Sequence, residues 1–155
     1  MAGGLSLSWM AGGLLFVALF FSIFPSTPLF YANNTPSVPR GVYVGISGTP
    51  QKGDWVIFES KKTGIDFSRM PPLLLKKVYV TGPCFLEVND YGVFIDGKYI
   101  CSRPIKNGIP PYYCNTRVRK DRVVLICDHP DSFDSRHFGP LNIKGMRKVI
   151  PVWKY

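Results

Sequence analysis

The N-terminal part of the chain is apolar and uncharged, and this constrains the fold before any other feature does. No charged side chain precedes Arg40, and residues 5–24 are predominantly apolar. A helix needs about 20 such residues to cross a bilayer, and Pro25 would end that helix. A cleaved signal peptide typically has a basic start and small residues at its cleavage site, but the chain has no basic start and no small residue two before Ala32. We therefore expect residues 1–25 to be one retained transmembrane helix.

The charged residues all lie in the C-terminal part, which is strongly basic. All 19 lysines and arginines and all 10 aspartates and glutamates follow the apolar segment, so this part carries the net charge of +9. A basic domain beside a membrane segment suits anionic lipid head groups or an acidic partner, although an ordinary soluble surface fits as well. No DNA- or RNA-binding motif is present, and we expect no nucleic-acid partner. Arg40 and Lys52 follow the span, and the positive-inside rule alone would place this part in the cytoplasm.

Short runs of β-branched and aromatic residues, separated by turn signals, fill the rest of the chain. After a proline-rich connector over residues 26–36, we expect strands in the segments 42–46, 54–59, 73–80, 85–88, 93–95, 123–126 and 149–153. The turn residues 89–92 predict a hairpin between two of these strands. No window after the apolar segment has a helical period. Residues 37–155 should thus form one mostly β domain, an antiparallel β-barrel or sandwich.

The four cysteines leave the redox state of the domain open. Cys84, Cys101, Cys114 and Cys127 include no C-x-x-C pair, and their spacing does not match the usual zinc-site patterns. We therefore expect no bound metal. An even number of cysteines suits disulfides in an oxidising compartment, and free cysteines buried as small apolar side chains fit equally well.

A turn rich in proline and hydroxyl groups follows the connector. Ser37 lies between Pro36 and Pro39, which restrict the backbone, and Gly41 allows a sharp bend. Thr35 lies two residues before Ser37, so in an extended segment both hydroxyls point to the same side. Ser37 would be held in one direction, as a nucleophile requires, and Thr35 with a backbone N–H would stabilise a developing oxyanion. By itself, the string also fits an ordinary linker turn.

Two adjacent lysines end a run of three leucines in one of the predicted strands. Along a strand, Leu74, Lys76 and Val78 share one face, and Lys77 lies on the other. If Leu74 and Val78 face the interior, Lys76 is drawn inside with them, where burial lowers a lysine pKa from about 10.4. A neutral amine can act as a general base. The alternative is a solvated lysine on a strand.

A third segment combines hydroxyls, a carboxylate and a guanidinium. The Ser132 hydroxyl can orient an amine, and an Asp134–Arg136 pair can fix the shape of the loop. A local turn closed by side-chain hydrogen bonds is the alternative. A serine activated by a lysine is a known nucleophile for acyl transfer, and the three segments together supply its parts. His129 and His137 lie outside any such nucleophile–base pattern.

These segments, in this order after one membrane segment, resemble the type I signal peptidase family, and most closely its conjugative-transfer (TraF-type) branch. That branch has a T-x-S-x-P-x-G-x-Y string, which residues 35–43 match. Residues 53–58 match the string G-D-x-V-x-F, and residues 132–139 match S-x-D-S-R-x-x-G. Residues 74–78 match L-x-K-R-V except that Lys77 replaces the arginine. The segments just before the last string and just after the lysine string depart from the family pattern, which bears on substrate specificity.

The resemblance implies roles for the residues of the three segments. It makes Ser37 the nucleophile and Lys76 the general base of a serine/lysine dyad. Ser132 would orient Lys76, while Thr35 and the backbone N–H of Ser37 would form the oxyanion hole. Asp134, together with Arg136, would support the site. The resemblance implies no cofactor and no metal.

The implied function is that of a membrane-anchored serine endopeptidase, which removes the leader of exported precursors and matures a conjugative pilin. Whether the product is hydrolysed or joined head to tail stays open, as do the oligomeric state and further partners in the conjugation apparatus. The family's catalytic domain lies on the periplasmic side of the inner membrane, and we follow this over the charge rule. The connector spans at most roughly 40 Å, so the site would lie near the bilayer. The rival reading is a non-catalytic membrane-anchored β-domain that binds or scaffolds.

Overall fold

The computed structural model describes residues 30–65, 70–103 and 109–155. The predicted transmembrane helix over residues 1–25 lies outside these ranges and stays a prediction. Within the described ranges, no helix is long and apolar enough to cross a membrane. The described chain is mostly β and wholly antiparallel, which confirms the predicted class of fold. Beside its strands it has a short helix, α2 (Ser135–Phe138), and a 3-10 turn, η1 (Ser60–Thr63).

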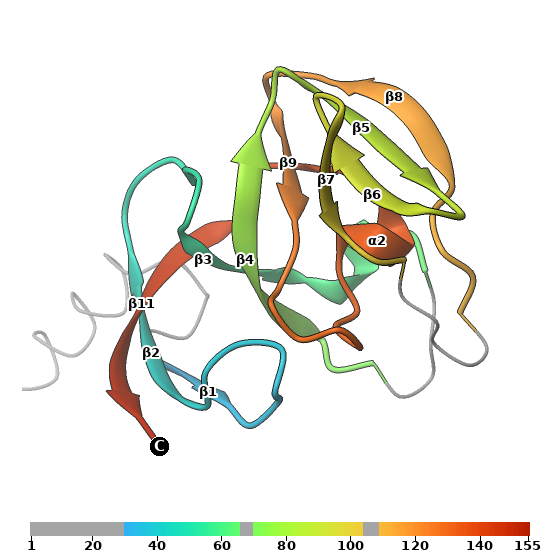
Figure 1. Cartoon of the computed structure of the whole chain (residues 1–155). Helices are drawn as coiled ribbons and strands as arrows, with labels where there is room; N and C mark the ends of the chain where they lie inside the picture. Colours follow the sequence, from blue (N-terminus) through green and yellow to red (C-terminus); the bar gives the residue numbers. More distant parts are fainter. Residues whose placement is uncertain (1–29, 66–69, 104–108) are drawn as a thin grey trace, which may run out of the picture.

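The larger of two sheets has seven strands, whose order in space differs from their order in the chain. In spatial order they are β1 (Phe30–Asn33), β2 (Gly41–Ile46), β11 (Arg147–Lys154), β3 (Trp55–Glu59), β4 (Leu73–Thr81), β9 (Arg122–Leu125) and β10 (Leu141–Asn142). The C-terminal strand β11 lies between β2 and β3, and Lys148 is paired with both Ile46 and Val56 (Figure 1). The end of the chain therefore joins two strands that lie before residue 60.

The smaller sheet has four strands and includes the predicted hairpin. In spatial order they are β7 (Lys98–Cys101), β6 (Gly92–Ile95), β5 (Cys84–Asn89) and β8 (Cys114–Val118). The turn between β5 and β6 is closed by Asn89, whose side-chain oxygen accepts hydrogen bonds from the backbone N–H groups of Tyr91 and Gly92. Gly92 has a φ of 145°, which glycine adopts without strain. The prediction of a hairpin around residues 89–92 is thus confirmed.

Two short elements depart from the sequence expectation. The sequence places residues 30–33 in the connector, but they form β1, paired with β2 from Phe30 opposite Val44 to Asn33 opposite Gly41. The sequence also predicts no helix after the apolar segment, whereas α2 makes one turn. Asp134 caps this turn, since its side chain accepts from the Arg136 N–H. Both elements depend on local side-chain caps or on pairing partners, and neither leaves a hydrophobic period in the sequence.

Strand β4 buries one face, as its sequence predicts. Leu74, Lys76 and Val78 are buried while the residues between them are only half-buried. Strand β3 pairs along the first half of β4, which includes Lys76, and β9 pairs along the second half. Because side chains alternate along a strand, the Lys76 side chain lies on the same face as Leu74 and Val78. Lys76 is therefore buried because of its position, between two core residues.

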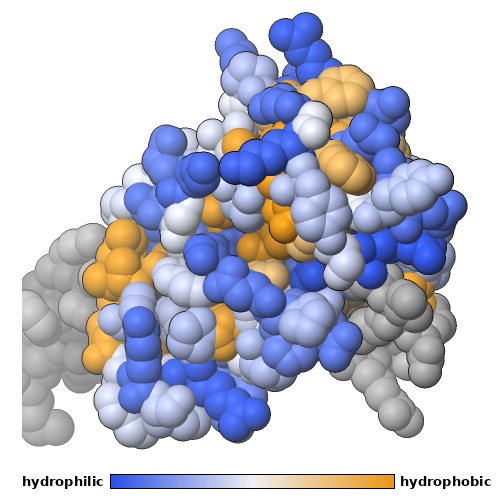
Figure 2. All heavy atoms as spheres, viewed as in Figure 1, coloured by the Kyte–Doolittle hydropathy of each residue, from blue (hydrophilic) through white to orange (hydrophobic). Residues whose placement is uncertain are grey.

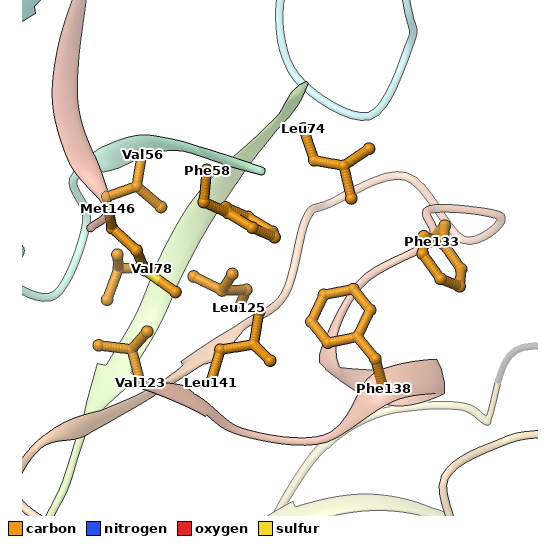
Figure 3. Packing of buried hydrophobic residues seen from close by; sticks show 10 residues of the cluster. All are labelled: Val56, Phe58, Leu74, Val78, Val123, Leu125, Phe133, Phe138, Leu141 and Met146. Atoms are coloured by element: carbon orange, nitrogen blue, oxygen red, sulfur yellow. The ribbon is translucent and has the colours of Figure 1, made fainter. Parts of the chain in front are cut away.

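Three hydrophobic clusters surround this strand. The largest, which Figure 3 shows, joins the inward faces of the central strands to the α2 segment and consists of Val56, Phe58, Leu74, Val78, Val123, Leu125, Phe133, Phe138, Leu141 and Met146. Within it, the ring of Phe138 packs edge-on against both Phe58 and Phe133. A second cluster fills the space between the two sheets. The third lies under the β1–β2 loop and includes Tyr31, Val38 and Tyr43. The first and third clusters hold the two sides of the site described below.

The cysteines are all free thiols. Cys114 and Cys101 lie at the two ends of one cross-strand row, which runs through Val88 and Val93. Strands are about 4.8 Å apart, so three steps separate these two α-carbons by about 14 Å. A disulfide needs them within about 7 Å. In this arrangement the smaller sheet keeps Cys101 and Cys114 from pairing with each other.

Candidate active site

The loop between β1 and β2 carries Ser37 and is organised by one side chain. Asn33, the last residue of β1, donates from Nδ2 to the carbonyl oxygens of Thr35, Val38 and Pro39 at 2.9, 3.1 and 3.2 Å. Its Oδ1 accepts from the N–H of Thr35 at 3.2 Å and from the Thr35 hydroxyl at 2.8 Å. Ser37 itself is half-buried at the turn of this loop. The loop thus has a defined shape, although its two prolines have no N–H group to donate to a hydrogen bond.

The C-terminal side of the same loop is fixed by packing and by a close backbone approach. Val38 is buried, and the Tyr43 hydroxyl donates to the Pro39 carbonyl at 2.6 Å. Gly41 has a φ of 151°, and a β-carbon there would lie 2.0 Å from the Trp153 carbonyl oxygen of β11. Glycine is therefore required at this position on two grounds, its dihedral angle and the space. The sequence prediction that Gly41 permits a sharp bend is confirmed.

Lys76 projects from β4 toward the segment that precedes α2. Its exposed fraction is 5%, and its Nζ lies 3.4 Å from the hydroxyl oxygen of Ser132, to which it donates. Ser132 is 1% exposed. Lys77, on the opposite face, lies over the Trp55 ring and pairs at 3.5 Å with the exposed Asp128. Adjacent lysines thus have contrasting environments, and the amine of Lys76 is held by a neutral hydroxyl acceptor.

Asp134 and Arg136 form a buried pair that folds the segment around Ser132. Arg136 donates from Nε to Asp134 Oδ1 and from Nη2 to Oδ2, both at 2.8 Å. Asp134 also accepts from the N–H of Cys127 at 3.0 Å, and Arg136 donates to the His129 carbonyl at 2.9 Å. Burial would lower the pKa of the Arg136 guanidinium, but the hydrogen bonds and charge of Asp134 raise it above its usual range. The pair is bidentate, and it ties residues 127–129 to the turn at residues 134–136.

A groove of about 1090 Å³ brings the first two predicted segments together. Thr35 and Ser37 line it from the loop and Lys76 from β4, while His129 and Asp131 line it from the turn just before the third segment. Most of the remaining lining is apolar and comes from Phe30, Tyr31, Ile57, Met70, Leu73, Leu74, Leu75, Ile109 and Phe133. A concave, mostly apolar site with a few convergent polar groups is the usual form of a substrate-binding groove. Figure 3 shows Leu74 on β4 and Phe133 near α2, two of the apolar side chains of this lining.

Three of the predicted site residues, Ser132, Asp134 and Arg136, lie beside the groove and do not line it. Ser132 accepts a hydrogen bond from Lys76, which does line it. The Asp134–Arg136 pair is buried behind the segment. His129 accepts from the Asp131 N–H at 3.2 Å and so closes a turn, and His137 packs on the Phe133 ring.

Two residues of the site give no catalytic signal in the sequence. Asn33 is one, although asparagine before a turn is known to bond nearby backbone groups. Cys127 is the other: it is 2% exposed, and its thiol interacts with Lys76 and Ser132. Burial raises the pKa of the Cys127 thiol, against the opposing effect of the Lys76 charge. No sequence pattern links Cys127 to Lys76, since the contact arises from the pairing of β4 with β9 and the segment beyond it.

Comparison with known proteins identifies the family. A family model described as "Signal peptidase, peptidase S26" matches residues 5–150. The chain therefore belongs to the signal peptidase S26 family. It is also similar to the plasmid transfer protein TraF of Escherichia coli, with 29% identity over 139 residues that cover 76% of this chain and 78% of TraF. These findings confirm the resemblance inferred from the sequence strings.

Proposed function

We propose that this protein is a serine endopeptidase that cleaves the leader from exported precursors, with Ser37 as nucleophile and Lys76 as general base. The observation that carries the proposal is the position of Lys76, buried on β4, bonded to Ser132 and lining the same groove as Ser37. Membership of the S26 peptidase family supports this assignment. A buried amine is suited to proton transfer, because burial disfavours its charged form.

The proposed reaction follows the usual course of acyl transfer by a serine. Ser37 Oγ attacks the carbonyl carbon of the scissile peptide, and its proton passes to Lys76 Nζ. The tetrahedral oxyanion is stabilised by the Ser37 N–H and, once its hydroxyl turns from Asn33, by Thr35. Lys76 then gives the proton to the leaving amine, and the C–N bond breaks to leave an acyl ester on Ser37. Water, or the amine of another peptide end, resolves this ester.

The proposed substrate is a membrane-tethered precursor of a conjugative pilin. The similarity to a plasmid transfer protein supports the conjugative setting. The volume and apolar lining of the groove support a mostly apolar peptide segment as the bound substrate. Tethering of enzyme and precursor to one bilayer would raise their effective concentration. Other components of the conjugation apparatus are proposed as partners on the same ground.

We also propose that residues 1–25 anchor the protein in the inner membrane and that its catalytic domain lies on the periplasmic side. One face of β1, β2 and β11 supports proximity to a bilayer: Phe30 and Ile150 both flank Val44 in register, and they are 61% and 45% exposed. Val152 and Trp153 add exposed fractions of 54% and 61%. Hydrophobic surface is visible on the side where β11 lies (Figure 2). This face begins where the described chain emerges from the predicted anchor.

Acylation of the serine separates this proposal from a non-catalytic binding domain. A fluorescent β-lactam offers a strained amide, and serine–lysine sites elsewhere are acylated by such compounds. We expect one equivalent of label on Ser37, located by peptide mass mapping, and no label on the Ser37→Ala protein. Equal labelling of the two proteins, or none of either, would favour the scaffold reading.

A further inference from the structure

The nucleophile loop lacks the backbone hydrogen bonds that usually close a turn. It runs from Asn34 to Arg40 and contains Pro36 and Pro39, which have no N–H to donate. Outside the strands, the described residues show no backbone-to-backbone hydrogen bond between two members of this loop. Something other than the backbone must therefore set the shape of the turn that presents Ser37.

The Asn33 side chain supplies those bonds, and its chemistry fits the place. It is 7% exposed and lies inside the loop because β1 alternates, with Tyr31 and Asn33 facing inward. The three groups around Nδ2 are carbonyl oxygens, which can only accept. The orientation of the amide is thereby fixed, and Oδ1 faces the two donors of Thr35. An aspartate in place of Asn33 would lose the Nδ2 donor, and a leucine would lose both the donor and the Oδ1 acceptor.

The Thr35 hydroxyl is engaged by the same amide. At 2.8 Å from Asn33 Oδ1, which only accepts, the hydroxyl must use its single proton there. In this state Thr35 therefore cannot donate to an oxyanion. Asn33 thus controls both the direction of Ser37 and the disposition of the group that the resemblance assigns to the oxyanion hole.

We infer that Asn33 is a positioning residue for the peptide-bond cleavage proposed above, holding the turn of Ser37 in its reactive shape through the bonds of its carboxamide to the loop backbone, which remain when the Thr35 hydroxyl turns toward the oxyanion. The inference rests on the proposed function of Ser37 and Lys76. Asn33 bonds to the loop backbone and to Thr35, and its role is to limit the motion of the nucleophile. Misplacement of reacting groups by about 1 Å can cost about 100-fold in rate. The loss should appear in the chemical step, because the groove walls that bind the precursor remain.

The test compares Asn33→Asp and Asn33→Ala with Asn115→Asp in cleavage of a purified pilin precursor in detergent micelles. Asn115 is the matched control, since it is exposed on β8 of the smaller sheet and does not line the groove. We expect kcat to fall by about 30- to 100-fold in both Asn33 variants. KM should stay within about threefold, and Asn115→Asp should stay close to wild type. A kcat within twofold of wild type in either folded Asn33 variant, or an equal loss in Asn115→Asp, would overturn the inference.

A second measurement tests the hydrogen bonds without activity. In Asn33→Asp the carboxylate faces three carbonyl oxygens, which favours its protonated form in the folded state. Protonation restores one donor, so the deficit in Tm relative to wild type should be full at neutral pH and should shrink as pH falls through the raised pKa of the introduced acid. A deficit that does not change with pH contradicts the inferred bonds. Activity of Ser37→Ala would instead overturn the proposed function and leave this result standing, so the two failures are distinguishable.

Discussion

Lys76 and Lys77 are adjacent in the chain, but only one of them reaches the groove. The alternation of β4 is sufficient to decide which, since Leu74 and Val78 are apolar and Lys76 shares their face. Its partner Ser132 lies 56 positions away and depends on how β9 and the following segment return to β4. At the scale of single residues, the sequence therefore predicts the direction of a side chain better than its contacts.

Removal of either member of the proposed dyad should abolish cleavage. We expect Ser37→Ala and Lys76→Ala to lower the rate by at least about 1000-fold, because groups that act as a unit lose nearly the whole effect when one is removed. Lys77→Ala is the matched control, because its amine points away from the groove to Trp55 and Asp128. The measurement is single-turnover cleavage by proteins shown to be folded by circular dichroism. A Lys76→Ala protein as active as Lys77→Ala would rule out Lys76 as the base.

The rate of precursor cleavage should rise with pH. Lys76 must lose its proton before it can accept one from Ser37, so the ammonium form present at lower pH is inactive and the neutral form is active. In single-turnover measurements, we expect the cleavage rate to follow a single ionisation and to increase from acid to alkaline pH. The folded state is monitored at each pH. The Ser132→Ala variant should change this profile, because it removes the acceptor 3.4 Å from Nζ. A flat profile would mean that another group takes the proton, with His129, which also lines the groove, the next candidate.

At the scale of elements, the segment from β9 to α2 is held by ionic and capping bonds. The strands of the hairpin, β5 and β6, and the alternation of β4 follow from local sequence, because each needs only a period of two or a turn signal. By contrast, β1 and α2 do not follow from local sequence. Strand β1 depends on pairing with β2, and helix α2 depends on the Asp134 cap and on the packing of Phe138. Short elements of this kind carry too few residues to show a period.

Asp134 should stabilise the fold of this segment and should not take part in proton transfer. Its carboxylate is fully buried and paired with Arg136, so Asp134→Ala would leave a buried, uncompensated guanidinium. We expect a loss of about 3–5 kcal/mol in the free energy of unfolding, measured by urea denaturation. Asp134→Asn should lower the cleavage rate less than Lys76→Ala does. Asp128→Asn, at an exposed position of the same segment, should change stability by less than about 0.5 kcal/mol. Equal losses at the two positions would contradict this account.

At the scale of the whole molecule, the two sheets and the C-terminal strand assemble the site from segments distant in the sequence. Strand β11 joins β2 to β3, and the Tyr155 hydroxyl donates to Asn34, the first residue of the nucleophile loop, at 2.8 Å. The order of strands could not be predicted from the sequence, because the pairings of β11 with β2 and β3, and of β4 with β9, are long-range. The three chemical strings could be predicted, because each is contiguous and resembles a known family pattern.

The orientation in the membrane is a prediction at this scale. We expect the full chain to retain its N-terminus and to expose residues 37–155 on the periplasmic side. Fusions at the C-terminus to a reporter active only in the periplasm, and to one active only in the cytoplasm, measure this in cells. Activity of only the cytoplasmic reporter would reverse the orientation, in agreement with the positive-inside rule. A mature N-terminus near Asn33 would show that the anchor is removed.

The central claim is that the protein cleaves a precursor that binds in the groove lined by Ser37 and Lys76. The most direct measurement is incubation of the purified full-length protein with a conjugative pilin precursor, followed by intact mass measurement of the products. The account predicts a product shortened by the leader, at the mass of the hydrolysed chain or 18 Da below it if the ends are joined, and intact precursor with Ser37→Ala. Precursor left intact by the folded wild-type protein, or cleaved equally by Ser37→Ala, would contradict it.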